Sequence, residues 1–352
     1  MIDIYGTLGP SCSSKQVLVQ MFRAGMTGIR LNLSHVSLRE SGPLLEVFHE
    51  AAKEAGVKPL LLIDMQGPEL RIGSLKKPVL LSEGENVILS CAGNPAEDPA
   101  GAPVIPIPEV VFRALDKGRG TPQQVLQQVL LDDGRILLEI SDTDIYVQDG
   151  MAAARVVRGG ELSGRKSIKV VGADVHPPTM TEADLQNIRD AASFGVTGIM
   201  QPFVRSRQDL EEVRRALIEN GADHLQLVAK IENRDGIRQL DSLLPACDAI
   251  CIARGDLGND MNLWELPAQQ KRIELACREA GKYFMVATQM LSSMETRAVP
   301  TRAEVNDIFN TVADGASGVM VTGETAVGKY PVEVIRFLAE TAREGEVYRN
   351  IG

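Results

Sequence analysis

The chain has 352 residues, of which 44% are hydrophobic and 24% charged, a composition typical of a globular protein with a buried core. With 47 acidic against 37 basic side chains and no basic run, it lacks the electrostatic pattern needed to bind nucleic acid or anionic membranes. No apolar stretch approaches the ~18 residues of a membrane span, the first residues show no signal-peptide pattern, and five cysteines without CxxC spacing favour reduced thiols. We therefore expect a cytoplasmic protein.

Short apolar, β-branched runs alternate with helix-like stretches along the chain. The eight expected strands are Ile2–Leu8, Gly28–Ser34, Pro59–Met65, Val196–Phe203, Leu225–Glu232, Ala249–Asp256, Tyr283–Met290 and Gly318–Glu324. The expected helices are Lys15–Ala24, Leu44–Ala55, Glu182–Phe194, Gln208–Asn220, Ile237–Leu244, Glu265–Ala280, Arg302–Ala313 and Val332–Ala342. Eight strands alternating with eight helices predict an α/β fold, a closed (β/α)8 TIM barrel.

Three of these helices carry start signals with a physical cause. Ser206 ahead of Asp209 and Thr301 ahead of Glu304 have the spacing of a capping box, in which each side chain satisfies the backbone of the other residue. Pro331 suits a first helical turn, where its missing N–H has no intrahelical partner to lose.

The alternation breaks after the third strand, over residues 73–174. Short alternating runs separated by Gly, Asp, Asn and Pro turns predict a small all-β domain inserted into a barrel of residues 1–72 and 175–352. Because loops after barrel strands lie at the catalytic rim, we expect this insertion to be a lid that covers the active site. The alternative is a peripheral domain with no role at the site. Its expected strands are Asn86–Ser90, Val129–Leu131, Arg135–Ile140 and Asp144–Val147, and an irregular loop is expected at Gly118–Pro122.

Polar residues stand at the carboxyl ends of six expected strands, where barrel enzymes keep their chemistry. Lys230 and Glu232 share a face because strand side chains alternate, and Asp256 ends the next strand. A cation beside two carboxylates suits phosphoryl transfer, because the carboxylates hold a divalent metal and the cation neutralises charge on the phosphoryl group that is transferred. The alternative is a set of salt bridges at the rim that only stabilises the fold. The other polar rim residues are Arg30, Asn32, Ser34, Asp64, Arg71, Thr288, Thr322 and Glu324.

Eight sequence blocks, taken together and in order, carry a family resemblance. They are Thr7–Ser11, Arg30–His35, Gly67–Arg71, Ala229–Asn233, Ala253–Gly258, Ala287–Leu291, Pro300–Glu304 and Gly323–Ala326. With these blocks the chain closely resembles the pyruvate kinase family, which implies transfer of the phosphoryl group of phosphoenolpyruvate to ADP, giving pyruvate and ATP in glycolysis.

The resemblance also implies roles for the residues that bind substrate. Glu232 and Asp256 match the ligands of the Mg²⁺ or Mn²⁺ ion that bridges phosphoenolpyruvate, Lys230 matches the lysine that stabilises the phosphoryl group in flight, and Arg30 matches an arginine on the phosphate. The backbone of Gly255 and Asp256, at the start of a short helical turn, matches the receptor of the substrate carboxylate.

The family pattern further implies two threonines for protonation and a bound monovalent cation. Thr288 matches a threonine beside the carbon that is protonated, and Thr322 stands where many relatives have a serine of a proton relay. Potassium would be bound by the residues matching Asn32, Ser34, Asp64 and the backbone carbonyl of Met65, and Glu69 matches the potassium-dependent branch.

The nucleotide phosphates would be bound from both parts of the chain. The matching residues are Asp132 or Asp133 and Lys166 in the insertion, with Arg71 on the barrel side. The family departures include Val36, Met65, Gln66 and Pro202, of which Pro202 borders the expected substrate site.

The chain ends after the helix that completes the barrel, so the family's C-terminal domain is expected to be absent and a homo-oligomer to form through barrel helices. Two other functions stay open from the sequence. The same metal and Lys230 could serve a lyase or decarboxylase that acts through a pyruvate enolate, or the chain could be a non-catalytic metabolite-binding subunit.

Overall fold

The computed structural model describes residues 2–34, 36–68, 70–91, 101–117, 127–132, 134–140, 145–146, 150–171, 173 and 177–351. The chain forms two compact units, one of residues 1–67 with 179–352 and the other of residues 68–178. The second unit therefore extends a few residues beyond both ends of the 73–174 segment expected from the sequence. The irregular loop expected at Gly118–Pro122 lies outside the described residues.

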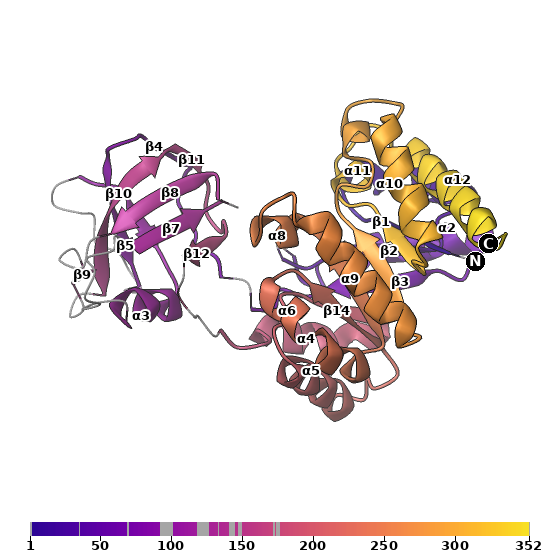
Figure 1. Ribbon diagram of the computed structural model, residues 1–352, viewed down its shortest axis with the longest axis horizontal. Coiled ribbons are helices and arrows are strands. Elements are labelled where there is room, and N and C mark those ends of the chain that lie inside the picture. Colours follow the sequence, from indigo (N-terminus) through magenta and orange to yellow (C-terminus); the bar gives the residue numbers. More distant parts are fainter. Residues whose placement is uncertain are drawn as a thin grey trace. The chain divides into compact units, whose positions relative to one another are not determined.

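The first unit is a closed barrel of eight parallel strands in the order β1-β17-β16-β15-β14-β13-β3-β2, with helices around it (Figure 1). Its strands are β1 (Asp3–Thr7), β2 (Gly28–Asn32), β3 (Leu60–Asp64), β13 (Gly198–Gln201), β14 (Gln226–Ile231), β15 (Ala249–Ala253), β16 (Tyr283–Ala287) and β17 (Gly318–Met320). All eight expected strands are confirmed. Each ends earlier than expected, because the last residues of each expected run belong to loops and short helical turns at the carboxyl rim.

The expected helices are also present, with two of them divided. Residues 182–194 change from an α-helix to a 3-10 turn at Ala191, and residues 237–244 fall across α6 and α7. The helices around the barrel are α1 (Lys15–Arg23), α2 (Gly42–Ala55), α4 (Glu182–Asp190), α5 (Arg207–Glu219), α6 (Arg234–Arg238), α7 (Leu240–Leu243), α8 (Arg254–Asn259), α9 (Leu266–Glu279), α10 (Arg302–Ala313), α11 (Gly323–Ala326) and α12 (Pro331–Arg349). Across the described ranges, none of the helices has the length and apolarity needed to cross a membrane.

The predicted helix starts are confirmed. Ser206 with Asp209, and Thr301 with Glu304, form complete capping boxes, and Pro331 occupies the first turn of α12. Their local hydrogen bonds explain why these starts are readable from the sequence.

A third capping box joins α4 to the loop after β3. The Asp184 carboxylate accepts hydrogen bonds from Thr181 at the start of α4 and from the backbone amides of Gln66 (2.8 Å) and Gly67 (3.0 Å). Asp184 is fully buried, so these donors are its replacement for water. One carboxylate thus fixes the loop that follows β3 at the rim.

The barrel interior is filled by side chains rather than open. Residues from several strands pack there, and Tyr283 Oη donates a hydrogen bond to Asp3 Oδ2 at 2.9 Å near the amino ends of the strands. A second, larger apolar layer fills the space between the strands and the surrounding helices. With the interior packed, the carboxyl rim is the part of the barrel that presents polar groups. The inner layer contains Tyr5, Leu62, Met200, Val228, Cys251, Met285 and Met320.

The second unit is built mainly from short strands around its own apolar core. Its main sheet has the order β12-β7-β8-β10-β5-β6, with β9 beside β10, and β11 pairs with β4. The strands are β4 (Val79–Leu81), β5 (Asn86–Ser90), β6 (Val104–Pro106), β7 (Gln127–Leu131), β8 (Ile136–Ile140), β9 (Ile145–Tyr146), β10 (Met151–Arg158), β11 (Gly160–Leu162) and β12 (Ile168–Val170). The unit also carries a helix that the sequence analysis did not expect, α3 (Glu109–Lys117), which packs Val111, Phe112 and Leu115 into the core.

Candidate active site

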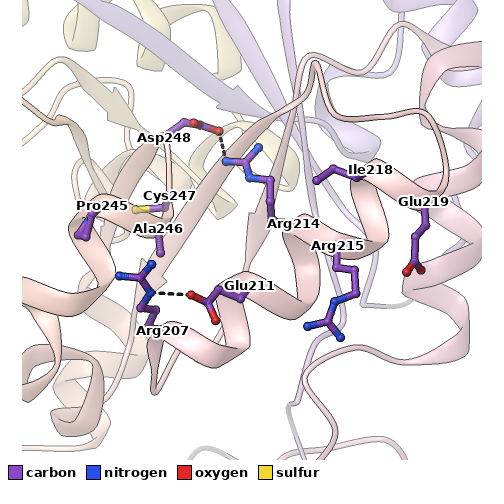
Figure 2. A pocket seen from close by; sticks show the side chains of 10 residues that line it. All are labelled: Arg207, Glu211, Arg214, Arg215, Ile218, Glu219, Pro245, Ala246, Cys247 and Asp248. Atoms are coloured by element: carbon purple, nitrogen blue, oxygen red, sulfur yellow. Dashed lines mark hydrogen bonds and ion pairs between the residues drawn. The ribbon is translucent and has the colours of Figure 1, made fainter.

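An open hollow of about 580 Å³ lies at the amino end of β15, against the outer face of α5 (Figure 2). Four of its charged side chains form two ion pairs: Arg207 Nε lies 2.6 Å from Glu211 Oε1, and one terminal nitrogen of Arg214 lies 2.7 Å from Asp248 Oδ2. None of the candidate site residues lines it. The chemistry expected from the sequence therefore has to be sought at the opposite, carboxyl end of the strands.

Lys230, Glu232 and Asp64 meet at that carboxyl end. The Lys230 ammonium lies 2.9 Å from Glu232 Oε1, and 3.1 and 3.0 Å from the two carboxylate oxygens of Asp64. Lys230 lies near the end of β14 and Ile231 points into the apolar layer, so the alternation of strand side chains turns Lys230 and Glu232 to the same side. The structure thus brings together three groups that the sequence placed on two separate strands.

Arg30 completes this cluster from β2. Its Nε donates to Asp64 Oδ2 at 2.8 Å, and one of its terminal nitrogens lies 2.6 Å from the same oxygen. β2 pairs with β3 so that Asn32 is directly beside Asp64, which places Arg30 two residues before the end of its strand and within reach of the carboxylate. Two cations therefore converge on one buried carboxylate.

Burial sets the electrostatics of the cluster. The side chains of Glu232 and Asp64 are 0% and 3% exposed, and that of Lys230 is 12% exposed. Burial alone would raise the pKa of Asp64, but Lys230 and Arg30 outweigh it and hold that pKa below its ordinary value. For Lys230, burial opposes the charge, yet the carboxylates of Asp64 and Glu232 dominate and raise its pKa well above its ordinary value, so it stays a cation.

Glu232 differs from Asp64 because negative charges gather around it. Burial raises its pKa, Lys230 lowers it, and Asp256 and Asp64 raise it; together they bring the pKa of Glu232 to about 7. The effect of Asp256 shows that this carboxylate, in the first turn of α8, lies within electrostatic range of Glu232. The mutual repulsion of these carboxylates would be reduced by binding a further positive charge.

The geometry of Glu232 fits a metal ligand. Its Oε2 accepts the backbone N–H of Phe203 at 2.8 Å, whereas its buried Oε1 accepts no hydrogen bond of suitable geometry, although the Lys230 ammonium is close. Within the described part of the chain, no group of three His, Cys, Asp or Glu side chains is arranged to hold a metal ion. A pair of carboxylates completed by water and substrate oxygens is the arrangement that Mg²⁺ favours, so Glu232 with Asp256 fits this ion.

The candidate potassium ligands lie at the ends of the neighbouring strands β2 and β3 and just after them. Asn32 Oδ1 accepts the backbone N–H of Ser34 at 3.1 Å, and Met65 is buried, with its N–H donating to Met200 O at 3.1 Å. Asp64, the charged member of the set, already faces two cations. Glu69 and His35 lie outside the described residues.

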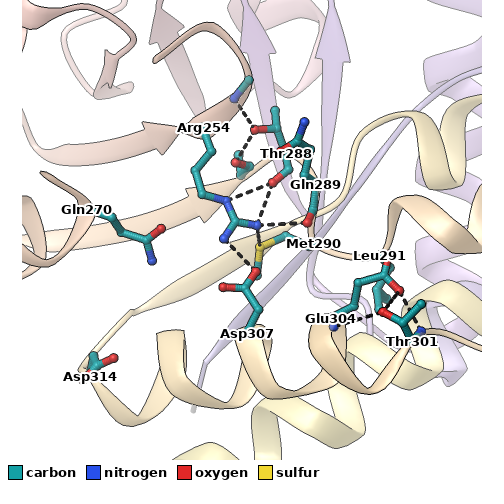
Figure 3. A network of polar contacts seen from close by, with 12 residues as sticks. Arg254, Gln270, Thr288, Gln289, Met290, Leu291, Thr301, Glu304, Asp307 and Asp314 are labelled. Atoms are coloured by element: carbon teal, nitrogen blue, oxygen red, sulfur yellow. Dashed lines mark hydrogen bonds and ion pairs between the residues drawn. The ribbon is translucent and has the colours of Figure 1, made fainter. Parts of the chain in front are cut away.

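Thr288 lies directly after β16, in contact with the start of α8 (Figure 3). Its Oγ1 accepts the backbone N–H of Gly255 at 2.7 Å and donates to Ala287 O at 2.6 Å. The amide that the family resemblance gives to the substrate carboxylate is thus bonded to Thr288 in this structure. A carboxylate binding there would have to share or replace the threonine oxygen.

Thr322 follows β17 and is fixed by a buried carboxylate. Glu324 Oε2 accepts the backbone N–H of Thr322 at 2.7 Å and its hydroxyl at 3.3 Å, while Oε1 accepts the backbone N–H of Leu291 at 3.1 Å. Glu324 is therefore a brace between the loops that follow β16 and β17. From sequence alone it was only a polar residue at the rim.

The described nucleotide-phosphate candidates all lie in the second unit; the expectation that Arg71 belongs to the barrel side is wrong, because the second unit begins at Pro68. Lys166 Nζ is 2.8 Å from Asp132 Oδ1, and Arg71, whose neighbour Ile72 donates its N–H to Lys166 O, donates to the carbonyl of Arg165 at 2.8 Å. Asp132 has a φ of 48°, a left-handed conformation that is uncommon outside glycine. The alternative candidate Asp133 lies outside the described residues.

Arg254 is a site residue that the sequence reasoning passed over. It was recognised only as part of a motif, yet its guanidinium is almost buried and binds the backbone around Thr288 as well as Asp307 on α10 (Figure 3). An arginine directly after the fully buried strand β15 is the signal that could have singled it out, because a buried guanidinium requires several partners.

The fold and this cluster define a class: a (β/α)8-barrel protein whose carboxyl rim combines a carboxylate pair suited to a divalent cation with a lysine and an arginine suited to an anion. The family model described as "Pyruvate kinase, barrel domain" matches residues 1–335. The chain belongs to the pyruvate kinase family.

Relatives from several bacteria agree with this family. The chain is 37% identical over 344 residues to a protein named "Pyruvate kinase" of Geobacillus stearothermophilus, an alignment that covers 97% of this chain and 56% of that protein. It is 35% identical to the protein of the same name from Bacillus licheniformis, of which it covers 56%, and 32% identical to that of Chlamydia muridarum (strain MoPn / Nigg), of which it covers 68%. The chain thus spans a little over half the length of the first two relatives.

Proposed function

We propose that this protein transfers the phosphoryl group of phosphoenolpyruvate to ADP, giving pyruvate and ATP. The observation that carries the proposal is the convergence of Lys230, Arg30, Glu232 and Asp64 at the barrel rim. Phosphoryl transfer needs little covalent help from the protein; it depends on positioning and on neutralising charge. A buried cluster of two cations beside a carboxylate pair supports that role, and so does the name shared by the relatives.

Glu232 Oε1 and the Asp256 carboxylate are the groups that would hold Mg²⁺ or Mn²⁺. An ion bound there would neutralise oxygens of the substrate and offset the repulsion between the two carboxylates. Lys230 acts as a fixed positive charge and not as a base, because its raised pKa keeps it protonated. Arg30, held by Asp64, directs its remaining donors to the phosphate.

After the phosphoryl group leaves, the enolate that remains must be protonated. Thr288 and Thr322 carry neutral hydroxyls, so they would orient a proton donor, such as water, and not supply the proton by titration. Glu324 fixes Thr322 for this task through two hydrogen bonds. Gly255 and Thr288 together would bind the substrate carboxylate.

Several further properties belong to this proposal. Potassium would be bound by Asn32, Ser34, Asp64 and the Met65 carbonyl, adding a charge beside the phosphate. The second unit would act as a lid that binds the nucleotide phosphates, and its contributions are Arg71, Asp132 or Asp133, and Lys166.

Two properties of the protein as a whole complete the proposal. A cytoplasmic location is supported by five free cysteines, four of them buried. Formation of a homo-oligomer through the barrel helices is proposed from the family resemblance.

A coupled assay with phosphoenolpyruvate, ADP, Mg²⁺ and K⁺ tests the proposal. ATP formed in step with pyruvate supports it. Pyruvate formed from oxaloacetate without nucleotide would instead identify a decarboxylase, and binding of phosphoenolpyruvate without turnover would identify a regulatory subunit; either result overturns the proposal. Lys230→Met should abolish turnover, whereas the matched control Lys15→Met, which removes a cation beside two exposed carboxylates of α2, should leave it unchanged.

A further inference from the structure

We propose that Arg254 is a positioning residue: together with Asp307 it clamps the Thr288–Gln289 backbone and thereby sets the Thr288 hydroxyl against Gly255. The proposal deepens the proposed function, because turnover should depend on the clamp, but its geometric part can be tested independently. Arg254 does not touch the substrate-facing oxygen itself and acts through the threonine.

The backbone that the clamp holds is in an unfavourable conformation. Thr288 has a φ of 71° and Gln289 a φ of 54°, so two consecutive non-glycine residues occupy the left-handed region. For a β-branched threonine this conformation is an outlier, and it persists only where surrounding contacts impose it. The segment directly follows β16, and without such contacts it would relax toward an extended path.

Arg254 supplies those contacts. Its Nε and one terminal nitrogen donate to Thr288 O at 3.1 and 2.8 Å, and the same terminal nitrogen donates to Gln289 O at 3.1 Å. It also lies 2.9 Å from Met290 Sδ. The guanidinium therefore binds the carbonyls of the two strained residues and the side chain of the next one, as Figure 3 shows.

Asp307 fixes the other end of the guanidinium. Its Oδ2 accepts a hydrogen bond from the second terminal nitrogen of Arg254 at 2.6 Å, and the arginine side chain is only 9% exposed. Asp307 lies in α10, whose start is held by the capping box of Thr301 and Glu304. A planar fork with donors on several sides is required for this set of acceptors, and a lysine ammonium cannot reproduce it.

The clamp links two parts of the candidate site. Arg254 is the first residue of α8, Gly255 and Asp256 follow it, and Thr288 Oγ1 accepts the Gly255 N–H at 2.7 Å. A shift of the Thr288 backbone would move this oxygen away from the amide that faces the substrate carboxylate. Misplacement of a reacting group by about 1 Å can reduce the rate about 100-fold.

A purely structural role is the alternative. Arg254 and Asp307 would then only join the barrel to α10, and their loss would reduce stability without changing the site of the molecules that remain folded. The two roles differ in what they predict for kcat and for the Gly255 amide.

The experiment compares Arg254→Lys and Asp307→Asn with the control Arg214→Lys, which alters an arginine–aspartate pair at the opposite end of the barrel (Figure 2). Steady-state kinetics gives kcat and the KM for ADP, and NMR-detected hydrogen exchange gives the protection of the Gly255 amide. We expect Arg254→Lys to lower kcat about 100-fold with the KM for ADP within about twofold, and to lower Gly255 protection at least about tenfold. The effects of Asp307→Asn should have the same direction and be smaller.

Wild-type kcat and wild-type Gly255 protection in the folded Arg254→Lys protein, matching Arg214→Lys, would overturn the proposal. If Arg254→Lys does not fold, Asp307→Asn decides by the same criteria, because it keeps the arginine and weakens only its anchor. If the wild-type protein has no activity with phosphoenolpyruvate and ADP, the proposed function fails, and the Gly255 exchange data alone decide whether the clamp exists.

Discussion

Replacing Lys230 by methionine should destabilise the barrel strongly in the absence of metal. The ammonium makes three contacts of 2.9 to 3.1 Å with two carboxylates that are at most 3% exposed. Methionine fills a similar volume, so the loss is mainly electrostatic: among the described residues, Glu232 keeps no cation in contact, and Asp64 keeps only Arg30. Breaking a buried pair in this way costs about 3–5 kcal/mol, because it leaves uncompensated charge in a poorly solvated place.

Lys15→Met is the matched control for this change. Lys15 also faces two carboxylates, those of Glu50 and Glu54, but its own side chain is 45% exposed and theirs are 64% and 51% exposed. Water screens such exposed pairs, so the control should lose far less stability than Lys230→Met.

Urea unfolding of wild type and both variants, followed by far-UV circular dichroism in chelator-treated buffer at pH 7, measures the two losses. Equal losses in the two variants, or a loss below about 1 kcal/mol for Lys230→Met, would contradict the conclusion that the rim cluster is electrostatically buried.

Three other outcomes are expected. Mg²⁺ should raise the melting temperature of the wild-type protein, and Glu232→Gln should remove that rise in a thermal melt, because binding to the folded state alone stabilises it. Burial would raise the pKa of Glu304, but hydrogen bonds from Ser293 and Thr301 outweigh it and hold that pKa below 4.5. The wild-type protein should therefore be more stable than Glu304→Gln above pH 4.5, and it should lose this advantage as the pH falls through the folded pKa. Urea unfolding at several pH values measures the difference. Asp184→Ala should cost about 3 kcal/mol or more in urea unfolding, since it leaves the buried amide of Gly67 and the partly buried amide of Gln66 without their acceptor. A loss below about 1 kcal/mol would mean that other groups satisfy these amides.

Much of the barrel was readable from the sequence because its signals are local. A strand such as Ala249–Ala253 is apolar throughout since both of its faces are covered, and a helix such as Arg302–Ala313 begins at a capping box that lies within four residues of chain. The candidate site residues were found for a related reason: polar side chains that end apolar strands must collect at one rim of a parallel barrel.

What the sequence missed depends on partners far along the chain. The break between α6 and α7 near Gln239, and the helix α3 in the second unit, were not expected, because packing against the rest of the fold decides whether a short apolar segment continues as a helix. The role of Arg254 was missed since its partner Asp307 is 53 residues away.

The sequence by itself determined which side chains stand at the carboxyl rim, because the two-residue alternation of a strand and the residue at its end are properties of a few neighbouring positions. Only the tertiary structure decided how those side chains pair. Lys230 and Asp64 are 166 residues apart, and they meet because barrel closure places β3 beside β13 and β13 beside β14 across the whole inserted segment. Burial then fixes their charge states, since the low-dielectric surroundings that shift a pKa exist only once the chain has folded.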